Sequence, residues 1–181
     1  MAKSLTPVYT LSMTHAAFLT GLLASIILVI GSAWPATKTK DRLFLVGNFG
    51  MLAYSILGYL NGSPIFFIFL ELLCVSSSVL FMLKVPEKTS TRLIAILGAV
   101  LLLASLYFLE GTNTVFFILG LIALALGFIT QKEVKRNTFF IAGCILIATF
   151  SYIENSMIFF WLNTIFGVFS TYYLLKALKK H

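Results

Sequence analysis

Seven long apolar runs dominate this sequence and leave little chain between them. The run Leu93–Leu109, for example, contains only Ser105 and Tyr107 as polar side chains. Inside a bilayer such a segment must satisfy its backbone hydrogen bonds internally, so it folds as an α-helix. Only 10% of the 181 residues are charged and 60% are apolar, whereas soluble domains are roughly a quarter charged. The sequence therefore predicts an all-α polytopic membrane protein and excludes a soluble enzyme or a large domain outside the bilayer.

Polar residues between the runs mark the ends of the predicted membrane spans. At about 20 residues for each span, seven spans account for most of the chain. The fifth is as short as any, at 16 residues. The first ends in Gly31-Ser32-Ala33, which is similar to a signal-peptide cleavage site, but basic residues follow it rather than precede it, so we expect it to be retained. The seven predicted spans are Thr14–Trp34, Leu43–Leu60, Ile65–Leu83, Leu93–Leu109, Thr114–Ile129, Thr138–Ile153 and Met157–Leu175.

The basic residues separate the connections between spans into two groups. Of the 13 lysines and arginines, all except Lys3 fall in alternate connections or at the C-terminus. Short basic loops stay in the cytoplasm, so we expect the N-terminus outside and the C-terminus inside a cell (inner or plasma) membrane. The net charge of +7 is interpreted as this topology signal and predicts no nucleic-acid partner.

Residues for enzymatic or metal chemistry are scarce. Cys74 and Cys144 both lie in apolar runs and have no His or carboxylate at ligand spacing, so we expect packing roles and no metal or disulfide. Membrane hydrolases and transferases need clustered His, Asp or Glu residues, and the spans contain Glu71 as their one carboxylate and His15 near the outer end of the first. The sequence therefore predicts neither an enzyme nor a bound cofactor.

An internal repeat relates the two halves of the chain. The segment Arg42–Lys84 aligns with Lys135–Ala177 without a gap, and eight residues fall on identical partners. Both segments begin at a basic connection, cross the membrane, turn and return. A repeat of three spans ends on the side opposite to its start, so one further span is needed between parallel copies. We therefore predict a first three-helix repeat over 1–84, a linker helix over 85–110 and a second three-helix repeat over 111–181.

This 3-1-3 pattern resembles the SWEET sugar transporters (the MtN3/saliva family) and the wider PQ-loop group. In that family the first helix of each triple ends in a Pro-Gln pair before a basic loop. Here the first span ends at Pro35 and the fifth at Gln131, so each copy keeps half of the pair. The segments Tyr59–Pro64 and Tyr152–Ser156 are similar to the turn of the family, and Asn163 with Gly167 is similar to its Asn-Gly feature.

The sequence also departs from the family pattern. Leu70 stands where the first copy would carry the partner of Asn163, and Glu71 follows it. The same 3-1-3 pattern is similar to nicotinamide-riboside transporters and to small bacterial inner-membrane proteins of unclear role. The resemblance implies a solute carrier whose inner gate lies near Pro35 and Gln131.

Glu71 and Asn163 are the main candidates for contact with a solute. Each lies seven residues into its span from the outer end, about 10 Å deep at 1.5 Å per residue. A central ionised carboxylate costs roughly 2.5–3.5 kcal/mol on insertion scales, so such residues face a cavity or a partner. Glu71 is interpreted as a solute ligand or proton-coupling site, or else as a protonated group bonded to another helix. For Asn163 the alternative is an ordinary interhelical hydrogen bond.

Further candidates extend this predicted chamber. Aromatic walls with a few polar groups are typical of small-molecule sites. For Asn48 the alternative is an interhelical hydrogen bond, and for Trp161 it is packing or lipid contact. The additional predicted solute-binding residues are Phe67, Cys74, Ser78, Phe159, Trp161 and Asn48.

The sequence thus predicts a transporter of a small neutral or weakly charged solute, sugar-like or vitamin-like. Transport would proceed by alternating access between two triple-helix bundles whose interface holds the solute. The alternative is a non-transporting integral membrane protein that acts through protein partners. The expected partners are the solute and the lipid bilayer, and homo-oligomerisation is left open.

Overall fold

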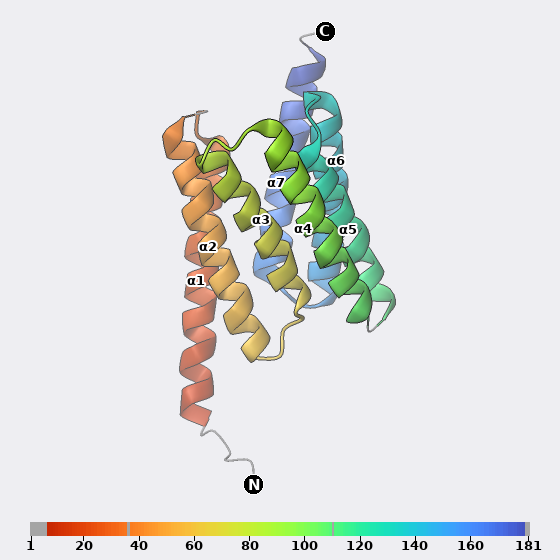
Figure 1. Ribbon diagram of the computed structural model, residues 1–181. Helices are drawn as coiled ribbons and strands as arrows, with labels where there is room; N and C mark the ends of the chain where they lie inside the picture. Colours follow the sequence, from red (N-terminus) through yellow and green to blue (C-terminus); the bar gives the residue numbers. More distant parts are fainter. Residues whose placement is uncertain (1–6, 36, 110, 180–181) are drawn as a thin grey trace.

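The computed structural model describes residues 7–35, 37–109 and 111–179, and side chains from His15 onward. Seven α-helices and no strands occur within these ranges. The helices run alternately up and down (Figure 1). Their bounds are α1 Pro7–Ala33, α2 Lys38–Leu60, α3 Phe66–Met82, α4 Glu87–Tyr107, α5 Thr112–Ile129, α6 Glu133–Ile153 and α7 Met157–Leu178.

Length and composition identify this chain as a multi-pass membrane protein. Six of the described helices are long and apolar enough to cross a bilayer, and α3, with 17 residues, is apolar but shorter. Large apolar side chains cover the outside of the bundle, among them Leu103 at 66% exposure and Ile96 at 63%. A soluble protein rarely exposes such a continuous apolar surface, whereas lipid contact satisfies it.

The helices extend beyond the apolar runs into polar sequence. α2, α4 and α6 begin at Lys38, Glu87 and Glu133, several residues before the predicted spans. Each has an acidic residue in its first turn, where a negative charge interacts favourably with the helix N-terminus. Helix lengths therefore do not follow span lengths: among the described helices α3 is the shortest, by one residue against α5.

The two ends of the bundle differ in charge. The α1–α2, α3–α4 and α5–α6 connections and the end of α7 lie together at the top of Figure 1. The basic residues of the described chain belong to these connections and to the adjoining helix ends, so we name this the basic end. The other end carries the α2–α3, α4–α5 and α6–α7 connections, and we name it the turn end.

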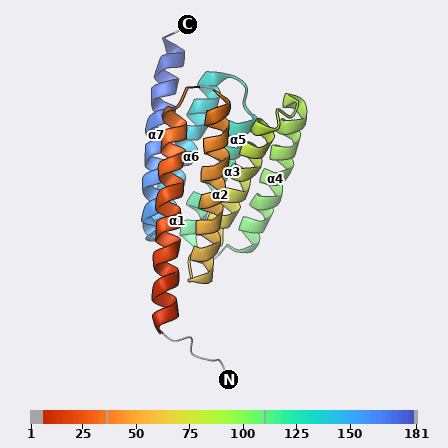
Figure 2. The same ribbon diagram turned by 90° about the vertical axis from the view of Figure 1, so that its left-hand side faces the viewer.

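Consecutive helices pack against one another throughout the bundle. Two further contacts close it, because α7 packs against α1 and α3 contacts α5. α4 lies at the edge, against α3 and α5 (Figures 1 and 2). The core is a phenylalanine cluster in the half nearest the turn end. There Phe66 contacts Phe69, Phe117 and Phe150, with ring centroids 5.1 to 6.2 Å apart.

Candidate functional site

Two phenylalanine side chains join α3 to α7 in the half of the bundle nearest the turn end. The rings of Phe67 and Phe159 stack with centroids 4.2 Å apart and planes 10° apart, and each residue is 1% exposed. Tyr54 of α2 packs on Phe159 at 5.5 Å. These three rings form the outer aromatic closure, which fills the place where the sequence predicted the aromatic wall of an open chamber.

Glu71 and Asn163 lie one helical turn below this closure, toward the basic end. Each stands four residues after the phenylalanine of its own helix, so it shares that residue's face. Because the two phenylalanines stack and the helices run in the same direction (Figure 1), the two polar residues lie at a similar level along α3 and α7, although the repeat alignment pairs Asn163 with Leu70. Glu71 is 3% exposed and Asn163 is 6% exposed. The sequence prediction that both lie at the same depth in the interior agrees with this placement.

The Glu71 carboxyl is incompletely satisfied. Its Oε2 is buried and has no hydrogen-bond partner among the described residues. By contrast, the Asn163 amide donates to the Phe159 carbonyl of its own helix at 2.9 Å. A buried polar atom without a partner costs about 1–3 kcal/mol and is uncommon in folded proteins. The only other such atom among the described residues is Nδ2 of Asn137, near the start of α6. At Glu71 the interior therefore offers a strong hydrogen-bonding position that the protein itself does not fill.

Asn48 joins α2 to α3 closer to the basic end. Its Nδ2 donates to the Ser78 hydroxyl at 2.7 Å and lies 3.4 Å from the Cys74 carbonyl oxygen. The sequence allows two roles for Asn48, solute contact and an interhelical hydrogen bond, and the structure contains this interhelical hydrogen bond. Cys74 is partly buried and Cys144 is buried, and both thiols are free.

A second aromatic layer lies nearer the basic end. Phe44 of α2 and Phe166 of α7 stack with centroids 6.4 Å apart. The Lys40 ammonium lies 5.8 Å from the ring centroids of Phe44 and Tyr173. The Tyr173 hydroxyl donates to the Ser32 carbonyl of α1 at 3.1 Å. These side chains form the inner aromatic closure, which seals α7 against α1 and α2.

The two closures enclose the polar interior. Phe159 and Phe166 are seven residues apart on α7, about 10 Å along the helix axis, and Asn163 lies between them. Sequence reasoning missed Tyr54, Phe44 and Phe166 as functional candidates. The signal that could have found the layers is the spacing of Phe159, Phe166 and Tyr173, which repeats every seven residues on one face of α7.

Three predicted site residues lie away from this interior. Trp161 is 60% exposed on α7 and contacts Phe160, as its alternative role in lipid contact requires. Pro35 and Gln131 are exposed at the basic end, each two residues after the last residue of its helix. Their predicted role in an inner gate therefore remains a prediction. No group of three or more His, Cys, Asp or Glu side chains in the described ranges is arranged to hold a metal.

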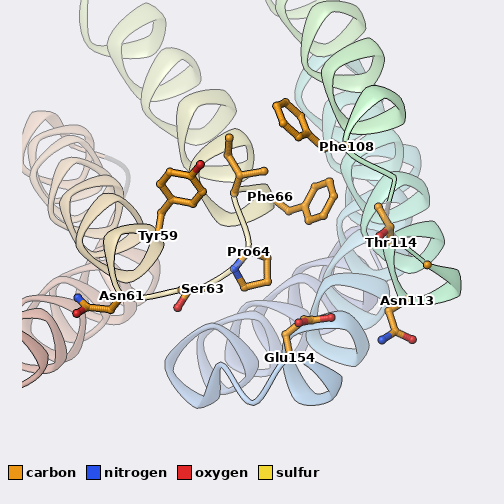
Figure 3. Close-up of a pocket in the computed structure, with 12 residues that line it drawn as sticks. Tyr59, Asn61, Ser63, Pro64, Phe66, Phe108, Asn113, Thr114 and Glu154 are labelled. Carbon is orange, nitrogen blue, oxygen red and sulfur yellow. The ribbon is translucent and has the colours of Figure 1, made fainter. Parts of the chain in front are cut away.

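An open cavity of about 650 Å³ lies at the turn end (Figure 3). It is bordered by the ends of α2, α4 and α6, the starts of α3 and α5, and the α2–α3 connection. A void of about 10 Å³ next to Ser63 and Ser156 lies between this cavity and the outer aromatic closure and has room for about one water. The residues lining the cavity are Tyr59, Asn61, Gly62, Ser63, Pro64, Ile65, Phe66, Phe108, Gly111, Asn113, Thr114 and Glu154.

The fold and the interior thus define an all-α multi-pass membrane protein with a buried carboxyl group between two aromatic closures. Comparison with protein-family models, with curated proteins and with solved structures finds no match for this chain. The resemblance to the SWEET and PQ-loop transporters therefore remains a prediction from the sequence.

Proposed function

We propose that this protein is a transporter of a small neutral or weakly charged solute, which crosses the membrane by alternating access between two three-helix units. The observation that carries the proposal is the buried Glu71 carboxyl, whose Oε2 has no partner in the described interior. Intramembrane ionisable residues are rare and are mostly found on substrate, ion or proton pathways. A purely structural glutamate would be expected to complete its hydrogen bonds within the protein.

The contacts between helices support two equivalent units, α1–α3 and α5–α7. In each unit the first helix packs on the second and the second on the third, while α3 contacts α5 and α7 contacts α1. These last two contacts correspond to each other if an axis along the membrane normal relates the units. α4 then serves as the linker helix. Parallel repeats of this kind place a solute site at their interface.

The turns after α2 and α6 share one hydrogen-bonding motif, which also ends α3 at Lys84, so what supports the repeat is that the two turns fall at equivalent positions of the alignment. In the first turn the Ser63 and Gly62 amides donate to the Gly58 and Tyr59 carbonyls. In the second turn, Ser156 and Asn155 donate to Ser151 and Tyr152. Gly62 and Asn155 both have positive φ, at 91° and 56°, as the residue that ends a helix in this motif requires. In the alignment of the two halves, Gly58, Tyr59, Gly62 and Ser63 pair with Ser151, Tyr152, Asn155 and Ser156.

The two aromatic closures support alternating access. A carrier must be able to seal its interior on either side, and here pairs of rings lie on both sides of Glu71 and Asn163. In the proposed mechanism these pairs close together in an occluded state. The outer closure would separate when α3 moves from α7, and the inner closure when α7 moves from α1 and α2. The positive-inside rule supports a cytoplasmic basic end.

Solute flux into proteoliposomes tests the proposal. A panel of sugars, nucleosides, vitamins and amino acids is first screened for thermal stabilisation of the purified protein. Flux of each stabilising solute is then compared with flux through Glu71→Gln and Asn163→Ala. We expect both variants to fold and to lose most of the flux, because Glu71→Gln removes the ionisable carboxyl group and Asn163→Ala removes the amide.

Ser105→Ala is the matched control. It removes a buried hydroxyl of α4 that donates to the Leu101 carbonyl of its own helix, away from the α3–α7 interface. This variant should retain full flux. Absence of flux and of stabilisation across the panel would contradict the proposal and favour a non-transporting protein that acts through partners. Equal flux in wild type and Glu71→Gln would show that transport does not need the carboxyl group.

A further inference from the structure

The cavity at the turn end has a chemistry of its own. Among the residues that the structure describes, its wall contains one carboxylate, Glu154, and no lysine or arginine. In Figure 3 this side chain lies between Pro64 of the α2–α3 connection and Asn113 of α5. Glu154 forms no ion pair with any residue whose placement the structure describes. The basic residues of the described chain lie at the other end of the bundle, so none of them supplies positive charge to this cavity.

Aromatic rings and neutral polar groups complete the wall. Tyr59 and Phe108 are 47% and 38% exposed at the rim, and Phe66 is 5% exposed at the floor. A cation that sits over such rings is stabilised by about 0.5–2 kcal/mol, more when water is excluded. Asn61, Ser63 and Asn113 add hydroxyl and amide groups that can bond a hydroxyl of the same ligand.

We propose that this cavity binds a small organic cation, an ammonium group that carries a hydroxyl, with its charge against Glu154 and the aromatic rim. The volume of about 650 Å³ lies within the range of small-molecule sites, about 300–1,000 Å³. A sugar would use the rings and the amides but would have no need of the carboxylate. An anion would be repelled by it. The site goes beyond the proposed transport function, because a ligand can bind here whether or not it crosses the membrane.

Choline and its neutral carbon isostere 3,3-dimethyl-1-butanol provide the test. Binding to purified full-length protein in a non-ionic detergent is measured by equilibrium dialysis and by thermal stabilisation at low ionic strength. We expect choline to bind and stabilise the protein and the isostere to do neither. Glu154→Gln should weaken choline binding by about tenfold, because one unit charge beside the ligand is removed at little change of shape. Phe108→Leu should weaken it several-fold through the lost ring.

Glu87→Gln is the matched control, since it removes an exposed carboxylate at the basic end and should leave choline binding unchanged. Short-chain phosphatidylcholine, tested separately below its micelle concentration, distinguishes a lipid headgroup from a free solute as the source of the ammonium group. Equal binding of choline and the isostere would overturn the proposal, and so would unchanged binding in Glu154→Gln. Failure of choline to bind would also overturn it. The experiment measures binding and not transport. Its result therefore tests the cation site even if the protein transports no solute.

Discussion

Glycine positions determine how closely neighbouring helices approach in this bundle. A Cβ atom added at Gly143 of α6 would lie 2.7 Å from the Leu124 side chain and 3.1 Å from its backbone nitrogen on α5. Gly120 has a similar relation to Ile147, at 2.7 Å from its side chain. Small residues at helix contacts allow backbones to approach and strengthen van der Waals packing in membranes.

Gly143→Ala should therefore destabilise the protein. Alanine gains roughly 1 kcal/mol of helix propensity over glycine, but overpacking a close contact typically costs about 1–3 kcal/mol, and the Leu124 backbone cannot move aside as a side-chain tip can. We expect a lower unfolding temperature in detergent, followed by circular dichroism. Gly111→Ala is the control, because no atom lies within 4 Å of its added Cβ. Equal unfolding temperatures for the two variants would contradict this account of the α5–α6 contact.

At the residue scale the sequence predicts depth in the membrane better than direction around a helix. Glu71 and Asn163 were placed correctly in the interior because a buried polar group in a span needs protection from lipid. Trp161 was included in the chamber, yet it faces outward at 60% exposure. Both faces of α7 are apolar, so the sequence contains little information on which face meets α3. The direction of each side chain is fixed by packing against neighbouring helices.

At the scale of elements, α3 is the helix that carries the interior chemistry. It is the shortest described helix, at 17 residues, and nine of these are buried, including Glu71, Ser77 and Ser78. It packs against α2 and α4 and also contacts α5. The Phe67–Phe159 stack is its aromatic contact with α7. Loosening this stack should therefore open the interior toward the turn end.

Labelling of Cys74 tests this role of the α3–α7 contact. Cys74 lies seven residues after Phe67, two turns deeper on the same face of α3. In a Cys144→Ser background, Phe159→Leu should speed the reaction of Cys74 with an impermeant maleimide added from the turn end. Loss of an aromatic pair costs about 0.5–1.5 kcal/mol, so the open fraction and the labelling rate should rise by up to about tenfold.

Phe81→Leu is the matched control for this labelling experiment. Phe81 belongs to the same helix as Cys74 but is 59% exposed, outside the outer aromatic closure. This variant should label at the wild-type rate, and a Cys74→Ser variant should not label at all. Unchanged labelling in Phe159→Leu would show that the stack does not limit access to the interior.

The number and order of helices could be predicted from the sequence, but their ends and their mutual contacts could not. Apolar content reports only the part of a helix that lies in lipid. The backbone hydrogen bonds of α4 and α6 continue into polar turns at Glu87 and Glu133, and these turns carry no apolar signal. The inner aromatic closure was missed because Phe44 and Phe166 belong to different helices. Their stacking depends on how α2 and α7 pack, which the sequence pattern does not encode.

At the scale of the whole molecule, the asymmetry of charge predicts how the bundle is inserted. The basic end includes Lys84, Lys88, Lys132 and Lys135, all exposed. The turn end carries no described lysine or arginine in its connections. Translocation of short basic loops across the membrane is disfavoured, so the whole bundle should insert with the basic end in the cytoplasm and an odd number of crossings between the two termini.

Single cysteines at the two ends test this orientation. In a Cys74→Ser, Cys144→Ser background, Thr112→Cys at the start of α5 should react with an impermeant maleimide added outside intact cells. Lys88→Cys at the start of α4 should react only after the membrane is permeabilised. Both native residues are exposed, so access through the membrane and not burial decides the result. Lys132→Cys, in the α5–α6 connection, should also react only after permeabilisation. The chain between positions 88 and 132 crosses the membrane twice, once in α4 and once in α5, and so returns to the same side. Reaction of Lys88→Cys in intact cells, or different behaviour of the two lysine positions, would contradict the seven-span arrangement with a cytoplasmic basic end.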